Sequence, residues 1–316
     1  MISVENLHEQ ASQSCHKPYL VKEAGVQDIS YSFLGSDYFS DMRSHLSDNK
    51  LNQLAEFAEI LEMPKTFGKF NSEKHYLDTY QLVTKSSDEL RHRGFFYLKN
   101  ILSRLRSRHK FLDVGPGNGE LLCWIGNQFK HVSAIDYNQE ALENLNANRN
   151  LLKKSIYLEK KQASILDLDL PQNSYDLASL AHVLYYIPQE RWLEVIKKLY
   201  GALKVGGHLV IVLSGDRNGK AALMKHFGGA PLSSDNLVFQ INKQLKAKVS
   251  VFESYEFYRS LSFTAILHIA GFFLADTQAI AREEELIQYV NEHFYDQQGG
   301  YYLSSQQKFI VVQRLA

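Results

Sequence analysis

Short apolar runs alternate with amphipathic segments along most of this chain. The pattern predicts strands near residues 111, 131, 155, 175 and 207 and helices near 120, 140 and 188. A further helix, with apolar positions at 95, 96, 98, 101, 102 and 105, leads into the first strand. Alternating strands and helices predict an α/β fold, a mostly parallel sheet with helices on both faces.

The C-terminal part predicts three further elements. Residues 264–270 predict a helix that ends at Gly271, residues 272–275 predict a strand, and residues 309–312 predict the last strand. The glycine-containing segment 297–302 provides a turn before that last strand.

The pattern divides the chain into three parts. Residues 1–75 are predicted to be an N-terminal helical extension, because an apolar stripe at helical spacing runs from Leu51 to Leu61 and stops before Pro64. This extension is either a cap packed on the main domain or a substrate lid or partner surface. Residues 76–316 form the main domain. An insertion at 215–260 within it is either a lid over a pocket or a pair of surface helices without a catalytic role.

The most informative stretch is 111–120. An apolar run ends at Asp113, and Gly115, Gly117 and Gly119 follow before a helical pattern begins. Glycines between a strand and a helix let backbone N–H groups approach a ligand where a side chain would clash. The dinucleotide fingerprint needs its third glycine one place later, where this chain has Glu120, which argues against NAD.

A carboxylate stands at the tip of the next predicted strand. Residues 131–135 form that strand and Asp136 follows, at a separation from the glycines close to the ~20 residues of nucleotide-binding folds. A carboxylate there can accept hydrogen bonds from both ribose hydroxyls of a nucleoside.

The order of these motifs resembles that of class I S-adenosylmethionine (SAM) methyltransferases. The glycine run resembles motif I of that class, and the segments 164–169, 174–181 and 203–213 follow in the expected order. The resemblance implies a Rossmann-like sheet whose last strand is antiparallel, and SAM as the cofactor. The cofactor-binding residues that it implies are Asp113, Gly115, Gly117, Gly119, Asp136, Ser164 beside the adenine, and Ala181 along the donor site.

Over residues 76–316 the chain also resembles the histamine N-methyltransferase family. The resemblance is carried by Leu184-Tyr185-Tyr186, Leu213-Ser214-Gly215, residues 224–228 and residues 234–237, with Ser86-Ser87-Asp88-Glu89 in the place of a Ser-Thr-Glu motif. It implies methyl transfer to a nitrogen of a small molecule, either a histamine-like compound or another small amine or imidazole. Tyr185 and Tyr186 would line the acceptor pocket.

Three positions differ from that family's residues. Asp88 corresponds to the glutamate that holds the amine, His182 to a glutamine, and Ser304 or Ser305 to an asparagine near the last strand. An amine must be neutral when it attacks, and an imidazole at the end of the fourth strand could take a proton near neutral pH. His182 is therefore either a base or a pocket-lining residue. Asp88 is either the amine anchor or a helix N-cap.

Composition narrows the class of protein further. The chain has 316 residues, of which 45% are hydrophobic, and 35 basic residues balance 35 acidic ones, so no overall charge recruits nucleic acid or a membrane. The basic stretch 104–110 reads as a solvated helix end rather than a nucleic-acid patch. The two cysteines suit a reducing cytoplasm and no disulfide framework. We expect a cytoplasmic monomer without a metal ion.

Two functions of different classes are compatible with these features. The first is a SAM-dependent methyltransferase that modifies a nitrogen, or alternatively an oxygen, of a small metabolite. The second is a protein of the same fold that binds SAM or a partner without turnover, using the N-terminal segment as its interaction surface.

Overall fold

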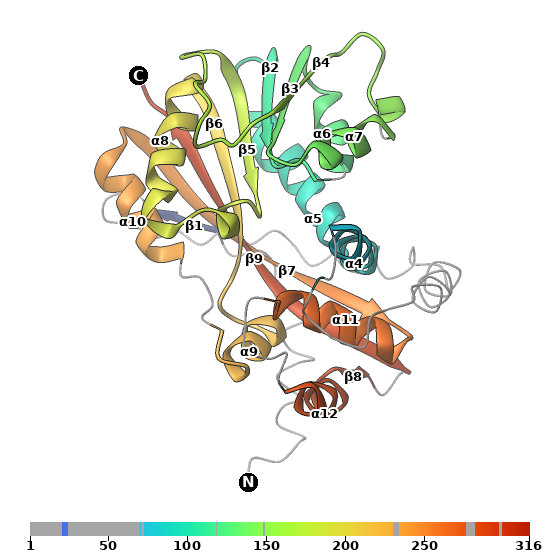
Figure 1. Ribbon diagram of the computed structural model, residues 1–316. Coiled ribbons are helices and arrows are strands. Elements are labelled where there is room, and N and C mark those ends of the chain that lie inside the picture. The colour runs from blue at the N-terminus through green and yellow to red at the C-terminus, as the bar shows by residue number, and fades with distance from the viewer. Residues whose placement is uncertain are drawn as a thin grey trace.

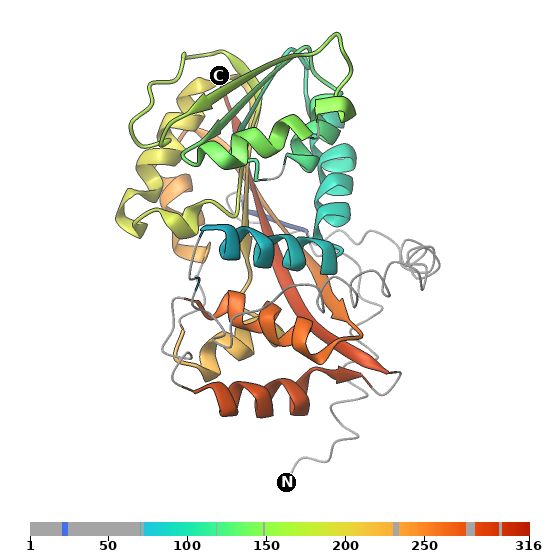
Figure 2. The same ribbon diagram turned by 45° about the vertical axis from the view of Figure 1, so that its right-hand side comes forward.

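The structure, a computed structural model, describes residues 21–24, 70, 73–117, 119–147, 149–229, 234–275, 282–296 and 299–316. The strands are β1 (Val21–Ala24), β2 (Lys110–Val114), β3 (His131–Asp136), β4 (Tyr157–Gln162), β5 (Tyr175–Ala181), β6 (Leu203–Ser214), β7 (Ala247–Ser260), β8 (Tyr295–Asp296) and β9 (Gly300–Arg314). Figures 1 and 2 show that they form a central twisted sheet.

Helices connect these strands. The α-helices are α4 (Glu73–Ser86), α5 (Glu89–Phe96), α6 (Glu120–Gly126), α7 (Gln139–Ala147), α8 (Trp192–Ala202), α9 (Gly219–His226), α10 (Ser234–Gln244), α11 (Phe263–Phe273) and α12 (Glu283–His293). Shorter helical turns are η1 (Tyr97–Ile101), η2 (Leu102–Arg104), η3 (Arg149–Leu151), η4 (Leu184–Tyr186) and η5 (Gln189–Arg191). Among the described residues no helix is long and apolar enough to cross a membrane.

The sheet is mostly parallel, with one reversed strand inside it. Its order is β1-β7-β9-β6-β5-β2-β3-β4, and β8 pairs with β9. Strands β2 to β6 are parallel, whereas β9 lies between β6 and β7 and is antiparallel to both. The predicted parallel sheet with an antiparallel last strand is confirmed.

Alternating side chains bury both faces of the sheet. On β6, Leu209, Ile211 and Leu213 belong to one core cluster, which also holds α8 and α10, while Val210 and Val212 belong to the other, with α5, α6 and α7. Because side chains alternate between the two faces of a strand, helices pack on both faces of the sheet, as predicted. The burial of apolar area is the main free-energy term that stabilises these helices on the sheet.

Two elements differ from the sequence-based expectation. The strand predicted at 272–275 is wrong, because Phe272 and Phe273 end α11. The Phe272 ring packs against the Tyr76 and Tyr80 rings of α4, so the apolar run covers a helix rather than entering the sheet. The sheet strand instead comes before the helix, as β7.

Residues 215–260, expected to be a lid-like insertion, are largely part of the domain core. Helix α10 covers one sheet face through Leu237 and Ile241, and β7 pairs with β9 over its whole length. Among the helices and strands described for this segment, only α9 contributes no residue to the two main core clusters. Strand β7 and helix α10 are thus part of the sheet and its cover, and whether the rest of 215–260 is a lid or a pair of surface helices stays a prediction.

The carboxyl edge of the sheet carries an extension that the parallel strands lack. Strand β6 stops pairing with β9 at Ser214, but β7 and β9 continue together to Ser260 and Tyr301. Helices α4, α9, α11 and α12 pack on this extension around a third apolar cluster that includes Tyr258 and Leu303 (Figure 1). The outer edge of β7 is covered by β1 and by a bridge from Ser87 to Tyr258.

Most of the predicted N-terminal extension, including its apolar stripe, lies outside the described residues. Within it, residues 21–24 are the strand β1 and residues 73–75 begin α4. Whether the rest is a cap or a lid stays a prediction.

Candidate active site

The glycine turn leaves the sheet at the end of β2. Gly115, Gly117 and Gly119 all have positive φ (69°, 59° and 76°), a conformation that costs a residue with a Cβ roughly 1–2 kcal/mol. Gly117 is also crowded, since an added Cβ would lie 2.8 Å from the hydroxyl of Tyr80 on α4. The N–H of Gly115 donates to the carbonyl of Ile135, which holds the turn against β3. The turn thus presents backbone rather than side chains at the carboxyl edge.

Asp113 lies beneath this turn and is 4% exposed. Its register partner on β5 is Ser179, whose hydroxyl accepts a hydrogen bond from Tyr97 at 2.8 Å. Burial raises the pKa of the Asp113 carboxyl to about 7, although Ser179 and Arg93 act in the opposite direction. This predicted cofactor residue therefore supports the turn from inside the domain.

Asp136 lies at the end of β3, as predicted. Its Oδ1 accepts the N–H of Asn138 at 3.0 Å, and burial raises the pKa of the carboxyl above its usual value. The carbonyl of Asp136 accepts the N–H of Ala163, so the next residue, Ser164, is held beside it. Ala181 ends β5, one strand away from the glycine turn on the other side. The structure thus places the predicted ribose, adenine and donor-site residues along one edge.

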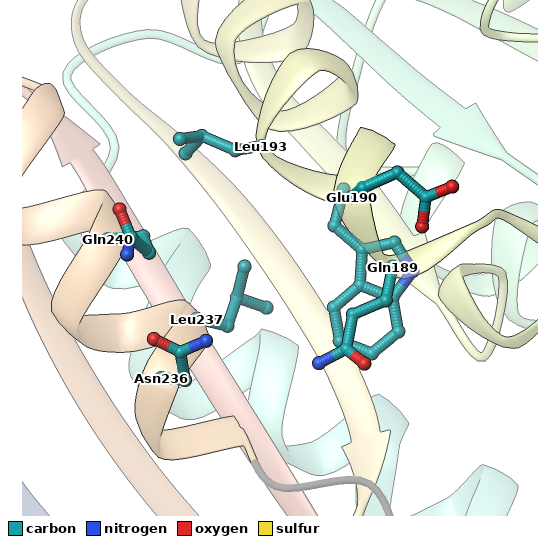
Figure 3. A pocket seen from close by; sticks show the side chains of 7 residues that line it. Gln189, Glu190, Leu193, Asn236, Leu237 and Gln240 are labelled. Atoms are coloured by element: carbon teal, nitrogen blue, oxygen red, sulfur yellow. The ribbon is translucent and has the colours of Figure 1, made fainter.

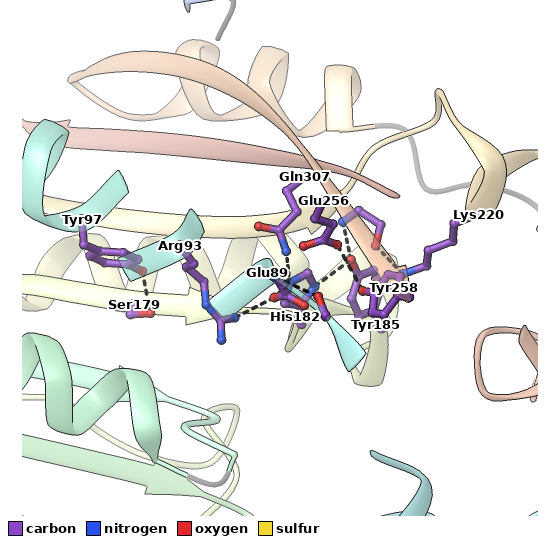
Figure 4. Close-up of polar contacts among 12 residues, drawn as sticks. Glu89, Arg93, Tyr97, Ser179, His182, Tyr185, Lys220, Glu256, Tyr258 and Gln307 are labelled. Carbon is purple, nitrogen blue, oxygen red and sulfur yellow. Dashed lines mark hydrogen bonds and ion pairs between the residues drawn. The ribbon is translucent and has the colours of Figure 1, made fainter. Parts of the chain in front are cut away.

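His182 follows β5 and forms the centre of a polar cluster (Figure 4). Its backbone is left-handed, with φ of 57°, a strain of about 1–3 kcal/mol that is most often found at functional sites. Its Nε2 lies 2.8 Å from Oε1 of Glu89, and the same oxygen lies 3.2 Å from Arg93. Burial alone would raise the pKa of Glu89, but the charges of His182 and Arg93 outweigh it and hold that pKa well below the usual range.

Two more groups fix the imidazole. The Tyr185 hydroxyl lies 3.3 Å from His182 Nδ1 and accepts the backbone N–H of Ser214. The Nε2 atom of Gln307 lies 3.2 Å from His182 Nε2. The Gln307 amide also forms a hydrogen bond with Glu89, which lowers the pKa of the Glu89 carboxyl. Both imidazole nitrogens are therefore held by protein groups.

Asp88 lies apart from this cluster. It occupies the N-cap position of α5, but its Oδ1 accepts the backbone N–H of Phe257 on β7 at 2.9 Å, and Ser87 caps the N–H of Glu89 instead. Ser304 is likewise engaged, because its hydroxyl accepts the N–H of Gly219 at 3.0 Å. The carboxylate that the structure brings to His182 is Glu89, the next residue after the one predicted.

Tyrosines form one wall of the site. The hydroxyls of Tyr76 and Tyr186 lie 2.8 Å apart, and the Tyr76 ring stacks on the Tyr80 ring with centroids 6.3 Å apart. Helix α4 thereby reaches from the glycine turn, through Tyr80, to the η4 turn. That turn is held in place by the Trp192 indole, which donates to the carbonyls of residues 184 and 187. The predicted pocket residues Tyr185 and Tyr186 lie at this wall.

The sequence did not reveal the polar residues that the strand extension adds. Glu256 on β7 and Ser305 and Gln307 on β9 are at most 1% exposed, and Glu256 lies directly across from Ser305. Lys220 on α9 donates to the hydroxyl of Ser214 at 2.8 Å, beside the same cluster. On β9 their signal in the sequence is the polar run 304–308, directly before the predicted last strand.

A separate cleft of about 250 Å³ lies between α10 and the segment η5–α8 (Figure 3). Its lining includes Gln189, Glu190, Asn236 and Gln240, none of which belongs to the polar cluster around His182.

Comparisons with known proteins agree with this geometry. A family model described as a methyltransferase domain matches residues 112–211. The YcgJ protein from Bacillus subtilis has a similar structure, with a TM-score of 0.52 and 15% identity over 72% of this chain and 99% of that chain. The chain has the fold of a class I methyltransferase.

Two further solved structures with this fold are similar. The N-methyltransferase NodS from Bradyrhizobium japonicum WM9 has a TM-score of 0.43 and 15% identity over 71% of this chain and 97% of that chain. A geranyl diphosphate methyltransferase, solved in complex with SAM, has a TM-score of 0.44 and 14% identity over 78% and 93%. No curated protein matches the sequence.

SAM is the cofactor of methyltransferases with this fold. The residues present fit it, because the three left-handed glycines carry no side chain that would keep a ligand from the backbone of the turn, and Asp136 supplies a carboxylate for a ribose. The predicted residues Asp113, Gly115, Gly117, Gly119, Asp136, Ser164 and Ala181 would hold the cofactor.

Proposed function

We propose that this chain is a SAM-dependent methyltransferase that modifies a nitrogen of a small amine or imidazole. The observation that supports the acceptor is the ion pair of Glu89 and His182, which lies at the carboxyl edge next to the strand that carries the glycine turn. In open α/β sheets ligands bind at this edge. A carboxylate there is complementary to a nitrogen that becomes positively charged.

The chemistry asks the protein mainly to align two groups. SAM supplies an activated methyl group when it is bound. The lone pair of the neutral acceptor nitrogen forms the new N–C bond, and the electron pair of the C–S bond leaves with the sulfur. Alignment of donor and acceptor can contribute about 7–11 kcal/mol to such a step. The nitrogen gains positive charge as it reacts, and the ionised Glu89 stabilises that charge.

His182 and Arg93 act as positioning residues in this proposal. Arg93 lies 3.2 Å from Glu89, and together with His182 it keeps the carboxylate ionised and fixed in one direction. Because Tyr185 and Glu89 hold both imidazole nitrogens, the geometry favours the pocket-lining role of His182 over the role of base. Asp88 has a structural role instead, since it joins α5 to the edge of β7.

The proposal is tested by incubating the protein with SAM that carries an isotope-labelled methyl group and a panel of small amines, imidazoles and phenols. We expect labelled amine and S-adenosylhomocysteine to appear in equal amounts. Glu89→Gln should lower kcat/KM on the order of 100-fold, the range found when one transition-state contact is removed. Asp88→Asn is the matched control, and it should lower thermal stability far more than kcat/KM.

Other outcomes are informative. Label found only on phenols would replace the proposal by O-methylation. SAM binding without product from any acceptor would instead support a binding protein without turnover. We further propose that the protein is a cytoplasmic monomer that acts on small molecules rather than nucleic acid, which light scattering and fractionation would test.

A further inference from the structure

Arg93 on α5 has hydrogen-bonding capacity that its protein partner leaves unsatisfied. One of its terminal nitrogens lies 3.2 Å from Oε1 of Glu89, and the same oxygen lies 2.8 Å from Nε2 of His182. Among the described residues, Glu89 is the one carboxylate within 4.0 Å of Arg93. A guanidinium keeps its charge and has five N–H donors in a planar fork. Arg93 therefore shares its one counter-ion and has donors left over.

Part of this guanidinium can be reached from outside. The Arg93 side chain is 15% exposed, and of its three nitrogens only Nε is both fully buried and without a hydrogen-bond partner. Figure 4 shows Arg93 between Ser179 and Glu89, with one end of the guanidinium at Glu89 and the other end directed away from it. The end that does not contact Glu89 is therefore available to a ligand.

This free end lies beside the glycine turn. Ser179 on β5 is the register partner of Asp113 on β2, the strand that leads into the turn. Burial raises the pKa of Asp113 and of Tyr80, and the positive charge of Arg93 opposes both rises. The Tyr80 hydroxyl in turn lies next to Gly117, since a Cβ added there would be 2.8 Å from it. Arg93 thus brings a positive charge to the turn at which the cofactor is expected.

Close packing fixes helix α5 in this position. The residue after Arg93, Gly94, lies so near to Trp124 of α6 that an added Cβ would be 2.6 Å from the indole ring. Helix α6 begins directly after the glycine turn. Arg93 is therefore held beside the turn by two packed helices, and a side chain that is already held in place loses little freedom when it binds a ligand.

SAM ends in an amino acid group, and an arginine can bind its carboxylate with two parallel hydrogen bonds. We propose that the free end of the Arg93 guanidinium binds this carboxylate, in SAM and in S-adenosylhomocysteine alike. The same side chain then contacts the cofactor at one end and Glu89 at the other. The inference concerns the cofactor, so it stands whether or not the acceptor is an amine.

The test compares S-adenosylhomocysteine with its decarboxylated analogue, which keeps the adenosine, the sulfur and the ammonium group and lacks only the carboxylate. Calorimetry on the native protein should give an affinity at least about tenfold higher for S-adenosylhomocysteine, as for one charge-assisted hydrogen bond. Arg93→Met should bring this ratio close to one and still bind the decarboxylated analogue at least as tightly as the native protein does. Arg93→Lys keeps the cation without the fork and should retain a smaller preference. Lys99→Met, at an exposed position on η1, is the control and should keep the native ratio.

The outcomes that would overturn the inference are distinct. Equal affinities of the native protein for the two ligands overturn it without any variant and leave SAM as the cofactor. A native preference in a folded Arg93→Met protein also overturns it, because another group then binds the carboxylate. An equal loss of affinity for both ligands in Arg93→Met would replace it by a purely structural role of Arg93. None of these measurements uses an acceptor, so they are independent of the test of the proposed function.

Discussion

Replacement of Asp113 by asparagine should change how the stability of the domain depends on pH. Burial raises the pKa of this carboxyl from 3.8 to about 7, so the folded state keeps its proton where the unfolded chain has lost it. The stability that this group contributes is complete below pH 4 and is lost as the pH rises through 7. Asparagine resembles the protonated form and does not titrate.

The magnitude follows from the two pKa values. Each pKa unit corresponds to about 1.36 kcal/mol, so a shift from 3.8 to about 7 corresponds to roughly 4 kcal/mol at pH 8. Asp113 is only 4% exposed, so solvent does not screen this term. Between pH 4 and pH 8 the native protein should therefore lose that amount of unfolding free energy relative to the Asp113→Asn variant.

Denaturant unfolding at several pH values measures this difference directly. Asp167→Asn, at an exposed position, is the control and should give a difference that does not change with pH. A flat difference for Asp113→Asn would refute the reasoning. It would mean that Arg93 and Ser179 keep Asp113 ionised in the folded protein despite its burial.

Three further substitutions test the site. Gly117→Ala should weaken SAM binding, because the added Cβ occupies the space through which the backbone approaches the donor and lies 2.8 Å from the Tyr80 hydroxyl. Gly228→Ala, with φ of 82° and open space, should cost a similar ~1 kcal/mol of stability and keep SAM affinity. Native affinity in Gly117→Ala would contradict this. Asp136→Ala should weaken SAM binding by about 1.5–3 kcal/mol in calorimetry, with exposed Asp169→Ala as control, and unchanged affinity would remove the ribose assignment. His182→Gln should keep most of kcat and the native pH profile, because the glutamine amide can still donate a hydrogen bond to Glu89. Loss of kcat together with a changed pH profile would instead show that His182 acts as a base.

The glycine turn and Asp136 could be predicted from the sequence because their pattern is local. An apolar strand, glycines and an amphipathic helix follow each other within a few residues, and the parallel order of β2, β3 and β5 then brings their ends together. The antiparallel last strand followed from the same resemblance. These features depend little on contacts between distant segments.

Glu89 could not be distinguished from Asp88 in this way. The two are neighbours, and the choice is made by β7, where the backbone N–H of Phe257 binds Asp88 and so turns Glu89 toward His182. Strand β7 was itself hidden, because its buried face carries the polar residues Ser254 and Glu256 between Phe252 and Tyr258. A strand that lines a polar site lacks the hydrophobic alternation by which strands are recognised.

The central claim is that SAM binds at the glycine turn and that its methyl group faces the Glu89–His182 pair. A crystal structure with S-adenosylhomocysteine tests it most directly. We expect the ribose hydroxyls within hydrogen-bond distance of Asp136, the adenine beside Ser164, and the sulfur directed past Ala181 toward His182. A ligand bound elsewhere, or bound here with its sulfur directed away from Glu89 and His182, would contradict the account.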